Sequence, residues 1–159
     1  MMRPRILLSV PDTPNFLICA KFAIVLTKHL NGQLTAVYVV NQKVVHDLLT
    51  EKIFVTSEAE AFTVSLEEQG TIFLANISAM ADEQNIPFKG SLVKGVVHHE
   101  VIKAVREIRA DLLVMGKLKK TLSVKDILYD EGERIFREAP CAVVSVRDEA
   151  AVERLYNEL

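Results

Sequence analysis

Cysteine is scarce in this chain of 159 residues, which has two cysteines and no tryptophan. Cys19 and Cys141 lie far apart, and neither has a Cys-x-x-Cys partner or a metal-ligand neighbour, which argues against a disulfide framework or a metal site built on cysteine. We expect two free, buried thiols of the kind found in a reducing cytoplasm. Long apolar runs are also missing, since the first run stops after Val10 and the next is interrupted by Lys21. We therefore expect neither a signal peptide nor a membrane span.

A strong charge of either sign is likewise absent. The formal net charge is −2 and the sequence pI is about 6.1, so the chain has no global attraction for nucleic acid or for an acidic membrane surface. Half of the residues are hydrophobic and a quarter are charged, which is typical of one globular domain with a large core. We expect a soluble, cytoplasmic protein that binds no nucleic acid.

Five short apolar runs predict five buried strands that alternate with helices. Runs that are almost continuously apolar are typical of parallel strands covered on both faces. The alternation predicts a doubly wound five-stranded parallel sheet, a Rossmann-like α/β fold with right-handed crossovers. The expected strands are Ile6–Val10, Leu34–Val40, Phe88–Val93, Leu112–Met115 and Cys141–Val146.

Turn and capping residues delimit the helices between these strands. Ser57 and Glu60 have the spacing of a capping box, which predicts the start of a long helix that contains Gly70, at a bend or a close contact. The segment 41–56 stays open, because it contains apolar residues for one or two helical turns but also an Ile53–Val55 run that could be extended. The expected helices run from Pro14 to Asn31, from Ser57 to just before Pro87, from Val97 to Arg109, and from Asp130 to Glu138.

Two apolar surfaces lie outside this simple pattern. The first helix has a second apolar stripe (Ile18, Phe22 and Val25), which indicates either an additional contact or burial under the segment 41–56. Asp148 can cap a short helical tail, residues 148–159, beyond a main domain of residues 1–147. We expect this tail either to cover its own domain or to dock on a partner subunit, through the side chains of Val152, Leu155, Tyr156 and Leu159.

No pattern of catalytic or metal-binding residues stands out. His98 and His99 are adjacent, whereas metal ligands on one helix fall three or four residues apart, so we expect surface histidines and no metal. A nucleophile needs a positioned base, and no recognisable pair of this kind is present. We expect a protein that is not an enzyme.

The run from Ala110 to Val146 has the frame of a nucleotide pocket. A buried strand ends at Gly116, a lysine-rich loop follows from Lys117 to Lys125, and a helix then leads into the last strand. A strand that ends in glycine and leads through a loop into a helix is how parallel α/β domains build such pockets.

These residues resemble the universal stress protein family over nearly the whole chain. The order and spacing of three stretches carry the resemblance. They are Gly95 with Glu100–Ala104 and Ala110–Gly116, then Glu133–Cys141 with Val143–Val146, and finally Ile6–Val10 with Leu34–Val40. The resemblance implies the adenine nucleotide alpha hydrolase-like three-layer sandwich.

The resemblance also implies a nucleotide site that is altered here. ATP-binding members have an aspartate at the end of the first strand, backbone contacts to the base at the end of the second, and a motif G-x-x-G, nine residues, then G-[ST]. The first glycine is Gly116, but the next positions of the motif hold Lys119, Tyr129 and Asp130, and the aspartate position holds Pro11. The implied residues of this altered pocket are Asp12, Val40, Gly116, Lys117, Lys119 and Asp130.

Asp130 is the most informative of these replacements. It would lie at the N-terminus of the last helix, where unpaired amides attract a phosphate, and Glu133 follows at capping-box spacing. Asp130 would therefore cap the helix, occupy the anion site and repel a triphosphate. The cluster Lys117, Lys119, Lys120 and Lys125 has two interpretations: a solvated loop, or a site for a smaller or differently placed anion.

The leading hypothesis is therefore a non-catalytic regulatory protein of the stress response with a degraded ATP pocket and no cofactor. The alternative is a switch that binds nucleotide, ATP or AMP weakly, or another anion through the lysine loop, and a slow nucleotide hydrolase is the third. Family members commonly form dimers through the last strand, here Ala142 to Val146. We expect a homodimer of this kind, with the tail helping to cover the interface.

Overall fold

Five parallel strands form one sheet in the computed structural model, which describes residues 3–119, 123–124 and 130–159. The strand order is β3-β2-β1-β4-β5, so the chain winds outward from β1 and then returns to its other side. The predicted doubly wound parallel sheet is confirmed. The strands are β1 (Arg5–Ser9), β2 (Gln33–Asn41), β3 (Phe88–Gly95), β4 (Leu112–Met115) and β5 (Ala142–Ser145).

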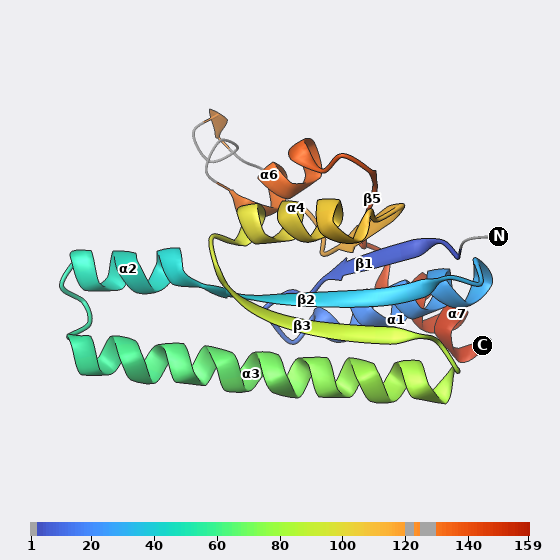
Figure 1. Ribbon diagram of the computed structural model, residues 1–159, viewed down its shortest axis with the longest axis horizontal. Helices are drawn as coiled ribbons and strands as arrows, with labels where there is room; N and C mark the ends of the chain where they lie inside the picture. The colour runs from blue at the N-terminus through green and yellow to red at the C-terminus, as the bar shows by residue number, and fades with distance from the viewer. Residues whose placement is uncertain (1–2, 120–122, 125–129) are drawn as a thin grey trace.

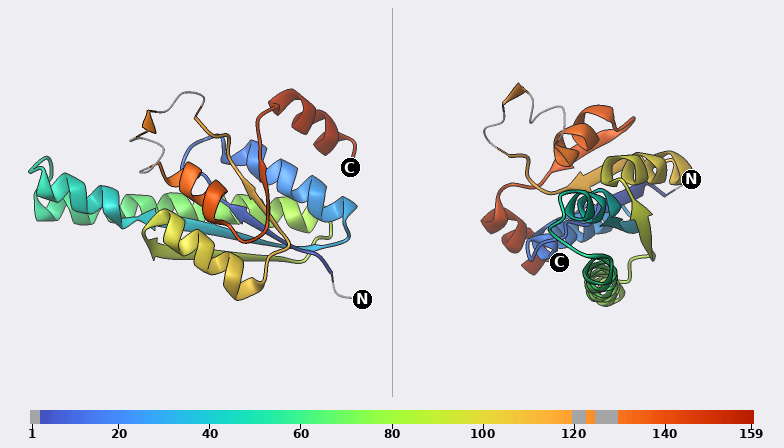
Figure 2. Two further views of the ribbon diagram at one scale, coloured as in Figure 1. Left: turned by 90° about the horizontal axis from the view of Figure 1, so that it is seen from above. Right: turned by 90° about the vertical axis from the view of Figure 1, so that its left-hand side faces the viewer.

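Helices cover both faces of this sheet, as Figures 1 and 2 show. Helices α1 and α3 cover one face and α4 and α6 the other, while α7 packs against the outer side of α1. The predicted helices are all present, with ends that differ by a few residues. Their bounds are α1 (Phe16–His29), α2 (Gln42–Thr50), α3 (Thr56–Glu83), α4 (Val97–Ile108), α6 (Glu131–Glu138) and α7 (Glu149–Asn157).

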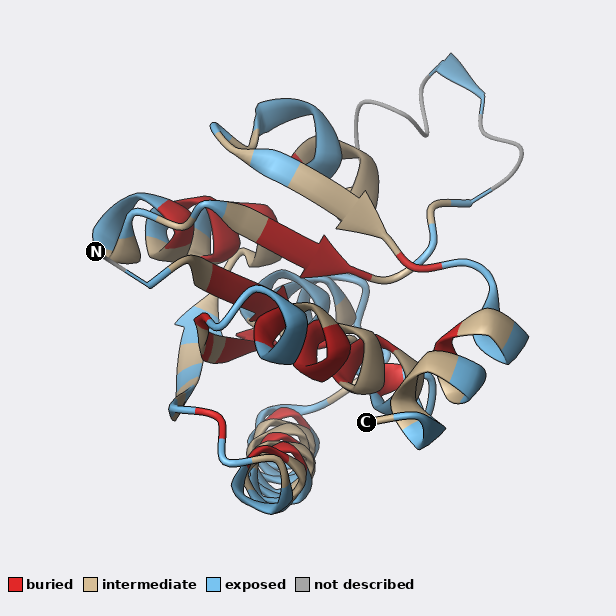
Figure 3. Ribbon diagram, turned by 90° about the vertical axis from the view of Figure 1, so that its right-hand side faces the viewer, coloured by how far each residue is buried: buried red, intermediate tan, exposed pale blue. Residues whose placement is uncertain are grey.

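The alternation of side chains along β1 divides the core into two layers. Ile6 and Leu8 pack towards α1 and α3, whereas Leu7 packs towards α4 and α6, and all three are fully buried. The buried residues lie mainly on the central strands and on α1, which is where Figure 3 is red. Burial of β1 on both faces explains its continuous apolar sequence.

Helix α3 begins at Thr56 and not at the predicted capping box. The Glu58 carboxylate reaches back to the Val55 backbone amide at 3.1 Å, so the pair with the required spacing is Val55 and Glu58. The interpretation that Ser57 and Glu60 form a capping box is therefore wrong by two residues. The helical alternative for the preceding segment is confirmed by α2, and Ile53–Val55 lies in a turn and not in a strand.

Gly70 marks the place where α3 makes close contact with the sheet. A Cβ atom at this residue would lie 2.5 Å from Tyr38 Cδ1 and 2.6 Å from Leu92 Cδ1. Of the two interpretations of this glycine, a close contact is the one that the structure shows. Helix α2, the turn after it and the first part of α3 project beyond the body of the protein (Figure 1). We call residues 42–69 the arm; its last residues, Leu66–Gln69, contact the body of the protein.

The C-terminal tail packs on its own chain. Lys21 Nζ of α1 lies 2.8 Å from Glu153 Oε1 of α7 and 5.4 Å from the ring centre of Tyr156. Val152 is buried in the core cluster that contains Ile18 and Phe22. The second apolar stripe of α1 is therefore covered by the tail, whereas the segment 41–56 lies in the arm.

Candidate functional site

A pocket of about 390 Å³ lies at the carboxyl end of the sheet, beside β1 and β4. Ligands of open α/β sheets bind at this end, at the point where the strand order reverses, and β1 is that point here. The lining comes from Ser9–Thr13 after β1, Val39 and Asn41 of β2, Val97 of α4, Met115–Lys119 after β4, and Asp130–Gly132 and Ile135 of α6.

Most of the site residues suggested by the sequence meet in this pocket. Asp12, Gly116, Lys117, Lys119 and Asp130 all line it. Val40 does not, because it is 1% exposed and faces the core beneath α1 and α3. Its neighbours Val39 and Asn41 line the pocket instead, since successive strand residues point to opposite faces. Lys120, Lys125 and Tyr129 lie outside the described residues.

Asp130 caps α6 as the spacing predicts. Its Oδ1 atom accepts the Glu133 backbone amide at 2.9 Å, and its Oδ2 atom lies 3.0 Å from Lys119 Nζ. Burial acts to raise the pKa of this carboxyl group, but the Glu133 amide and the Lys119 ammonium outweigh it, and the pKa is lowered. Asp130 is therefore ionised at neutral pH, and it occupies the anion-attracting end of the helix.

The N-terminus of α4 holds a second carboxylate. Its N-cap residue is Val96, which has no side-chain acceptor. Glu131 supplies one from α6: its Oε2 atom accepts the backbone amide of His98 at 2.6 Å and lies 2.7 Å from Nδ1 of the same residue. Because an ionised carboxylate only accepts hydrogen bonds, Nδ1 carries the hydrogen. Glu131 thus caps α4 from outside and links it to α6.

This contact was not predicted from the sequence, and the expected exposure of its histidine is wrong. His98 is only 5% exposed, so the expectation of a surface residue is wrong for it, although it is correct for His99. The Nε2 atom of His98 is buried and has no hydrogen-bond partner among the described residues. Val96 could have indicated such a contact in the sequence, because an apolar residue at the start of a helix leaves backbone amides that need an acceptor from elsewhere.

Two consecutive acids thus fill both helix N-termini at the pocket. Asp130 occupies that of α6 and Glu131 that of α4. The described lining contains three acids and two lysines, and Lys119 is already paired with Asp130. Lys117 has no acidic partner within 4.0 Å among the described residues. The acceptors at both helix N-termini are thus side chains of the protein itself.

The opposite end of the pocket, between the loop after β1 and the end of β2, has no such filling. Apolar side chains of Val10, Pro11, Val39 and Val97 line it together with Asn41. Gly116 leaves ordinary space, since a Cβ atom there would lie 3.5 Å from Pro11 Cγ. We call this part of the pocket the open end.

Comparison with known proteins now identifies the family. The model of the universal stress protein family matches residues 2–147. The chain belongs to the universal stress protein family. The resemblance drawn from the sequence is confirmed, and so is the Rossmann-like, adenine nucleotide alpha hydrolase-like fold.

Individual members of the family show how far the similarity extends. Universal stress protein MJ0531 of Methanocaldococcus jannaschii is 29% identical over 128 residues, which cover 80% of this chain and 72% of that protein. A universal stress protein family structure from Burkholderia pseudomallei has a TM-score of 0.69 at 22% identity, covering 92% of this chain and 98% of its own. One from Arabidopsis thaliana with AMP bound has a TM-score of 0.63 at 11% identity, and the match covers 93% of this chain and 94% of that chain.

The thiols of this universal stress protein do not take part in the pocket. Burial, with a smaller contribution from Glu149, raises the pKa of Cys19 to about 11. Burial also raises the pKa of Cys141, which is half-buried and not fully buried as expected. Both cysteines are free, as predicted. Over the described residues, no three His, Cys, Asp or Glu side chains are placed to hold a metal ion.

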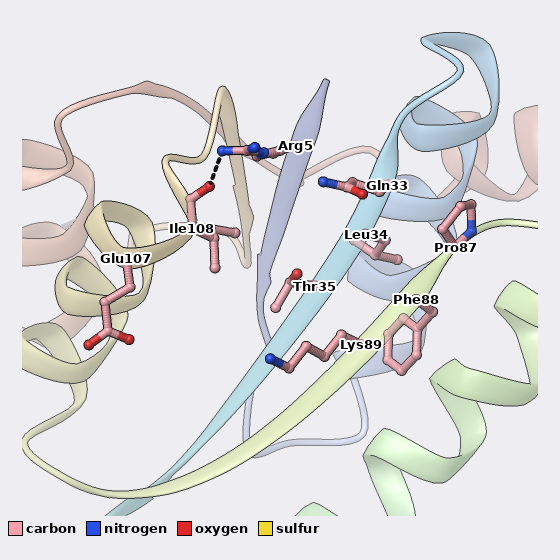
Figure 4. Close-up of a pocket in the computed structure, with 9 residues that line it drawn as sticks. All are labelled: Arg5, Gln33, Leu34, Thr35, Pro87, Phe88, Lys89, Glu107 and Ile108. Carbon is pink, nitrogen blue, oxygen red and sulfur yellow. Dashed lines mark hydrogen bonds between the residues drawn. The ribbon is translucent and has the colours of Figure 1, made fainter. Parts of the chain in front are cut away.

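A second cavity, of about 430 Å³, lies at the amino ends of the strands (Figure 4). Arg5, Gln33, Thr35 and Lys89 line it from three adjacent strands. The Arg5 guanidinium is turned away to the Ile108 carbonyl, which accepts it at 3.1 Å. This contact ties β1 to the end of α4, so the arginine has a structural role.

Among the described residues, none of the helices is both long enough and apolar enough to cross a membrane.

Proposed function

We propose that this chain is a non-catalytic regulatory member of the universal stress protein family, active in the stress response, whose pocket does not hold ATP. The supporting observation is Asp130, which caps α6 and pairs with Lys119 inside the pocket. A triphosphate docks by placing its oxygens on the free amides of a helix N-terminus. Here the amide of Glu133 already has a carboxylate acceptor.

Electrostatic repulsion would also oppose the binding of ATP. A triphosphate would bring several negative charges next to the Asp130 and Glu131 carboxylates, and like charges at such separations repel. Lys119 offers little compensation because Asp130 already neutralises it at 3.0 Å. We infer that the protein's own carboxylates take the place of the ligand's phosphates.

The residues that meet in the pocket support a non-catalytic role. Its described lining contains Ser9 and Thr13 but no histidine and no cysteine. Activation of a hydroxyl nucleophile requires a base within hydrogen-bond reach. Regulation through binding therefore fits this lining better than hydrolysis does.

A second candidate function is a switch that responds to a small anion or a mononucleotide. The ammonium of Lys117, which has no acidic partner within 4.0 Å in the part of the chain that the structure describes, favours it together with the open end of the pocket. The relative from Arabidopsis thaliana has AMP bound. In this version, AMP would place its ring in the open end and its phosphate near Lys117, away from the N-terminus of α6.

Calorimetric titration with ATP, ADP and AMP tests both functions. The proposal predicts no ATP binding at ligand concentrations of about 1 mM, corresponding to a binding free energy weaker than roughly −4 kcal/mol. Binding of AMP that weakens in a Lys117→Ala variant would establish the second function. Micromolar ATP affinity, or phosphate release from ATP that disappears in that variant, would overturn the first.

We further propose a homodimer through the last strand. Strand β5 is an edge of the sheet and is followed by the buried Val146, and edge strands pair readily with a second copy. Since the tail packs on α1 of its own chain, its deletion would also remove part of the core. The test therefore uses the full chain, for which sedimentation equilibrium should give twice the monomer mass of 17.8 kDa. A single 17.8 kDa species at about 0.1 mM would contradict the dimer.

A further inference from the structure

The arm exposes apolar side chains without a core of its own. Helix α2 has nine residues, none of them buried, and isolated helices of that length are marginal in water. An edge-to-face contact between Phe54 and Phe62, with ring centres 5.6 Å apart, joins the turn to α3. Five large apolar side chains of the arm are nonetheless exposed: Val44, Leu49, Ile53, Val55 and Val64. Apolar side chains gathered on a projecting segment are typical of an interaction surface.

The arm is also strongly acidic. Residues 42–69 contain six acids and two lysines, so the arm has a net charge of −4 and the rest of the chain one of +2. No lysine or arginine occurs between Ile53 and Phe88, which includes the whole of α3. Glu67 is neutralised by Lys94 of β3 at 2.6 Å, while Glu58, Glu60 and Glu68 are exposed. The exposed Val64 of α3 thus lies between acidic side chains, Glu60 and Glu68, one helical turn to either side.

Exposed apolar side chains beside acidic ones indicate the chemistry of a partner that would bind the arm. We propose that the arm docks a basic amphipathic helix of a partner protein, whose apolar face covers Val64 on the exposed side of α3 and whose lysines or arginines face Glu60 and Glu68, one helical turn to either side of it. Charge complementarity sets the choice of partner and the apolar contacts supply the affinity. Two copies of the arm would instead bring together two surfaces of the same net charge, which is unfavourable.

The arm is attached at the rim of the pocket, so a partner helix docked on the arm would lie near the pocket. Asn41 lines the pocket and also caps α2, with its Oδ1 atom 3.3 Å from the Val44 amide. On α3, the Gln69 side-chain amide donates to the Asp12 carbonyl at 2.9 Å and to the Tyr38 hydroxyl at 3.0 Å. The docking surface does not depend on what the pocket binds, so it stands independently of the proposed function.

Fluorescence anisotropy of labelled model peptides on the full chain tests the proposal. The probe is an amphipathic leucine–lysine peptide of about 18 residues, long enough as a helix to span the arm. A peptide with the same composition in scrambled order and a leucine–glutamate peptide are the controls. We expect the basic amphipathic peptide to bind at least about 10-fold more tightly than either control, and more weakly as salt is added. Equal binding of the scrambled or acidic peptide overturns the proposal.

Matched variants locate the binding. Val64→Ser should weaken binding about 10-fold, since a buried valine contributes roughly 1.5 kcal/mol. Leu30→Ser is its control, because Leu30 is similarly exposed, 47% against 51%, but lies at the end of α1, outside the arm. Glu60→Gln with Glu68→Gln should also weaken binding, whereas Asp82→Asn with Glu83→Gln should not.

Thermal melting confirms that each variant is folded. Equal losses in the Val64 and Leu30 variants would show that binding is not located at the arm and would overturn the proposal. So would a self-association of the free protein that Val64→Ser abolishes, because a second copy would then be the occupant.

Discussion

The two ends of the pocket differ in what fills them. At one end, Asp130 and Glu131 place carboxylates on the N-termini of α6 and α4. At the other end, beside β1 and β2, Asn41 and apolar side chains leave space. We infer that the fold keeps the shape of a ligand site while its sequence supplies the charge that a ligand would bring. The difference between the two ends also implies that the filled end contributes to stability, whereas the open end contributes little.

The largest loss of stability is expected at His98. Substituting alanine removes a buried side chain and its charge-assisted hydrogen bond to Glu131. We expect the free energy of unfolding to fall by about 2–3 kcal/mol, as measured by urea denaturation. His98→Leu should cost less, because it fills the space and removes the unpartnered Nε2 atom.

A double-mutant cycle isolates the link between the two helices. Combining His98→Leu with Glu131→Gln should give a coupling energy of about 1–2 kcal/mol. Simple additivity of the two substitutions would show that the contact between α4 and α6 does not contribute to stability.

A smaller effect is expected for Asp130→Ala, which removes the cap of α6 and the ion pair with Lys119. Loss of a cap costs about 1–2 kcal/mol. Because folding lowers the pKa of Asp130, its contribution is complete above the ordinary value of 3.8 and is lost as the pH falls through the lowered pKa. The melting temperatures of variant and wild type should therefore differ at neutral pH and converge as the pH falls well below 3.8. An equal difference at neutral and at such low pH would argue against the cap.

The smallest effect is expected at the open end. Asn41→Ala removes the cap of α2, a helix without buried residues. We expect a change of about 0.5–1 kcal/mol that is confined to the arm. Hydrogen exchange of the Val44 amide should accelerate while that of the Val114 amide in β4 does not. Faster exchange in β4 would show that the open end also supports the sheet.

The fold was largely predictable because its signals are local. The apolar runs of β1, β2 and β4 and the turn at Asn31 are readable over a few residues. The start of α3 was misplaced because Ser57 with Glu60 and Val55 with Glu58 are competing pairs of equal spacing, and only the latter forms.

The site was predictable in part. The cap at Asp130 follows from the spacing to Glu133, whereas His98 and Glu131 are separated by 33 residues and meet only through packing of α4 on α6. Val40 was chosen over Val39 and Asn41 because a strand of continuous apolar residues does not reveal which of its faces borders the pocket. Tertiary contacts of this kind leave no periodic pattern in the sequence.

We propose that the protein's own carboxylates replace a nucleotide's phosphates. The sharpest test is ATP titration of a variant in which the family's glycine and serine residues are restored. The variant combines Lys119→Gly, Tyr129→Gly and Asp130→Ser, with Glu133→Gln as a control that removes one acid from the same helix turn. The wild type and the control should not bind ATP at about 1 mM, and the restored variant should bind it at least about 100-fold more tightly. Micromolar ATP binding by the wild type, or no gain in a folded restored variant, would contradict the account.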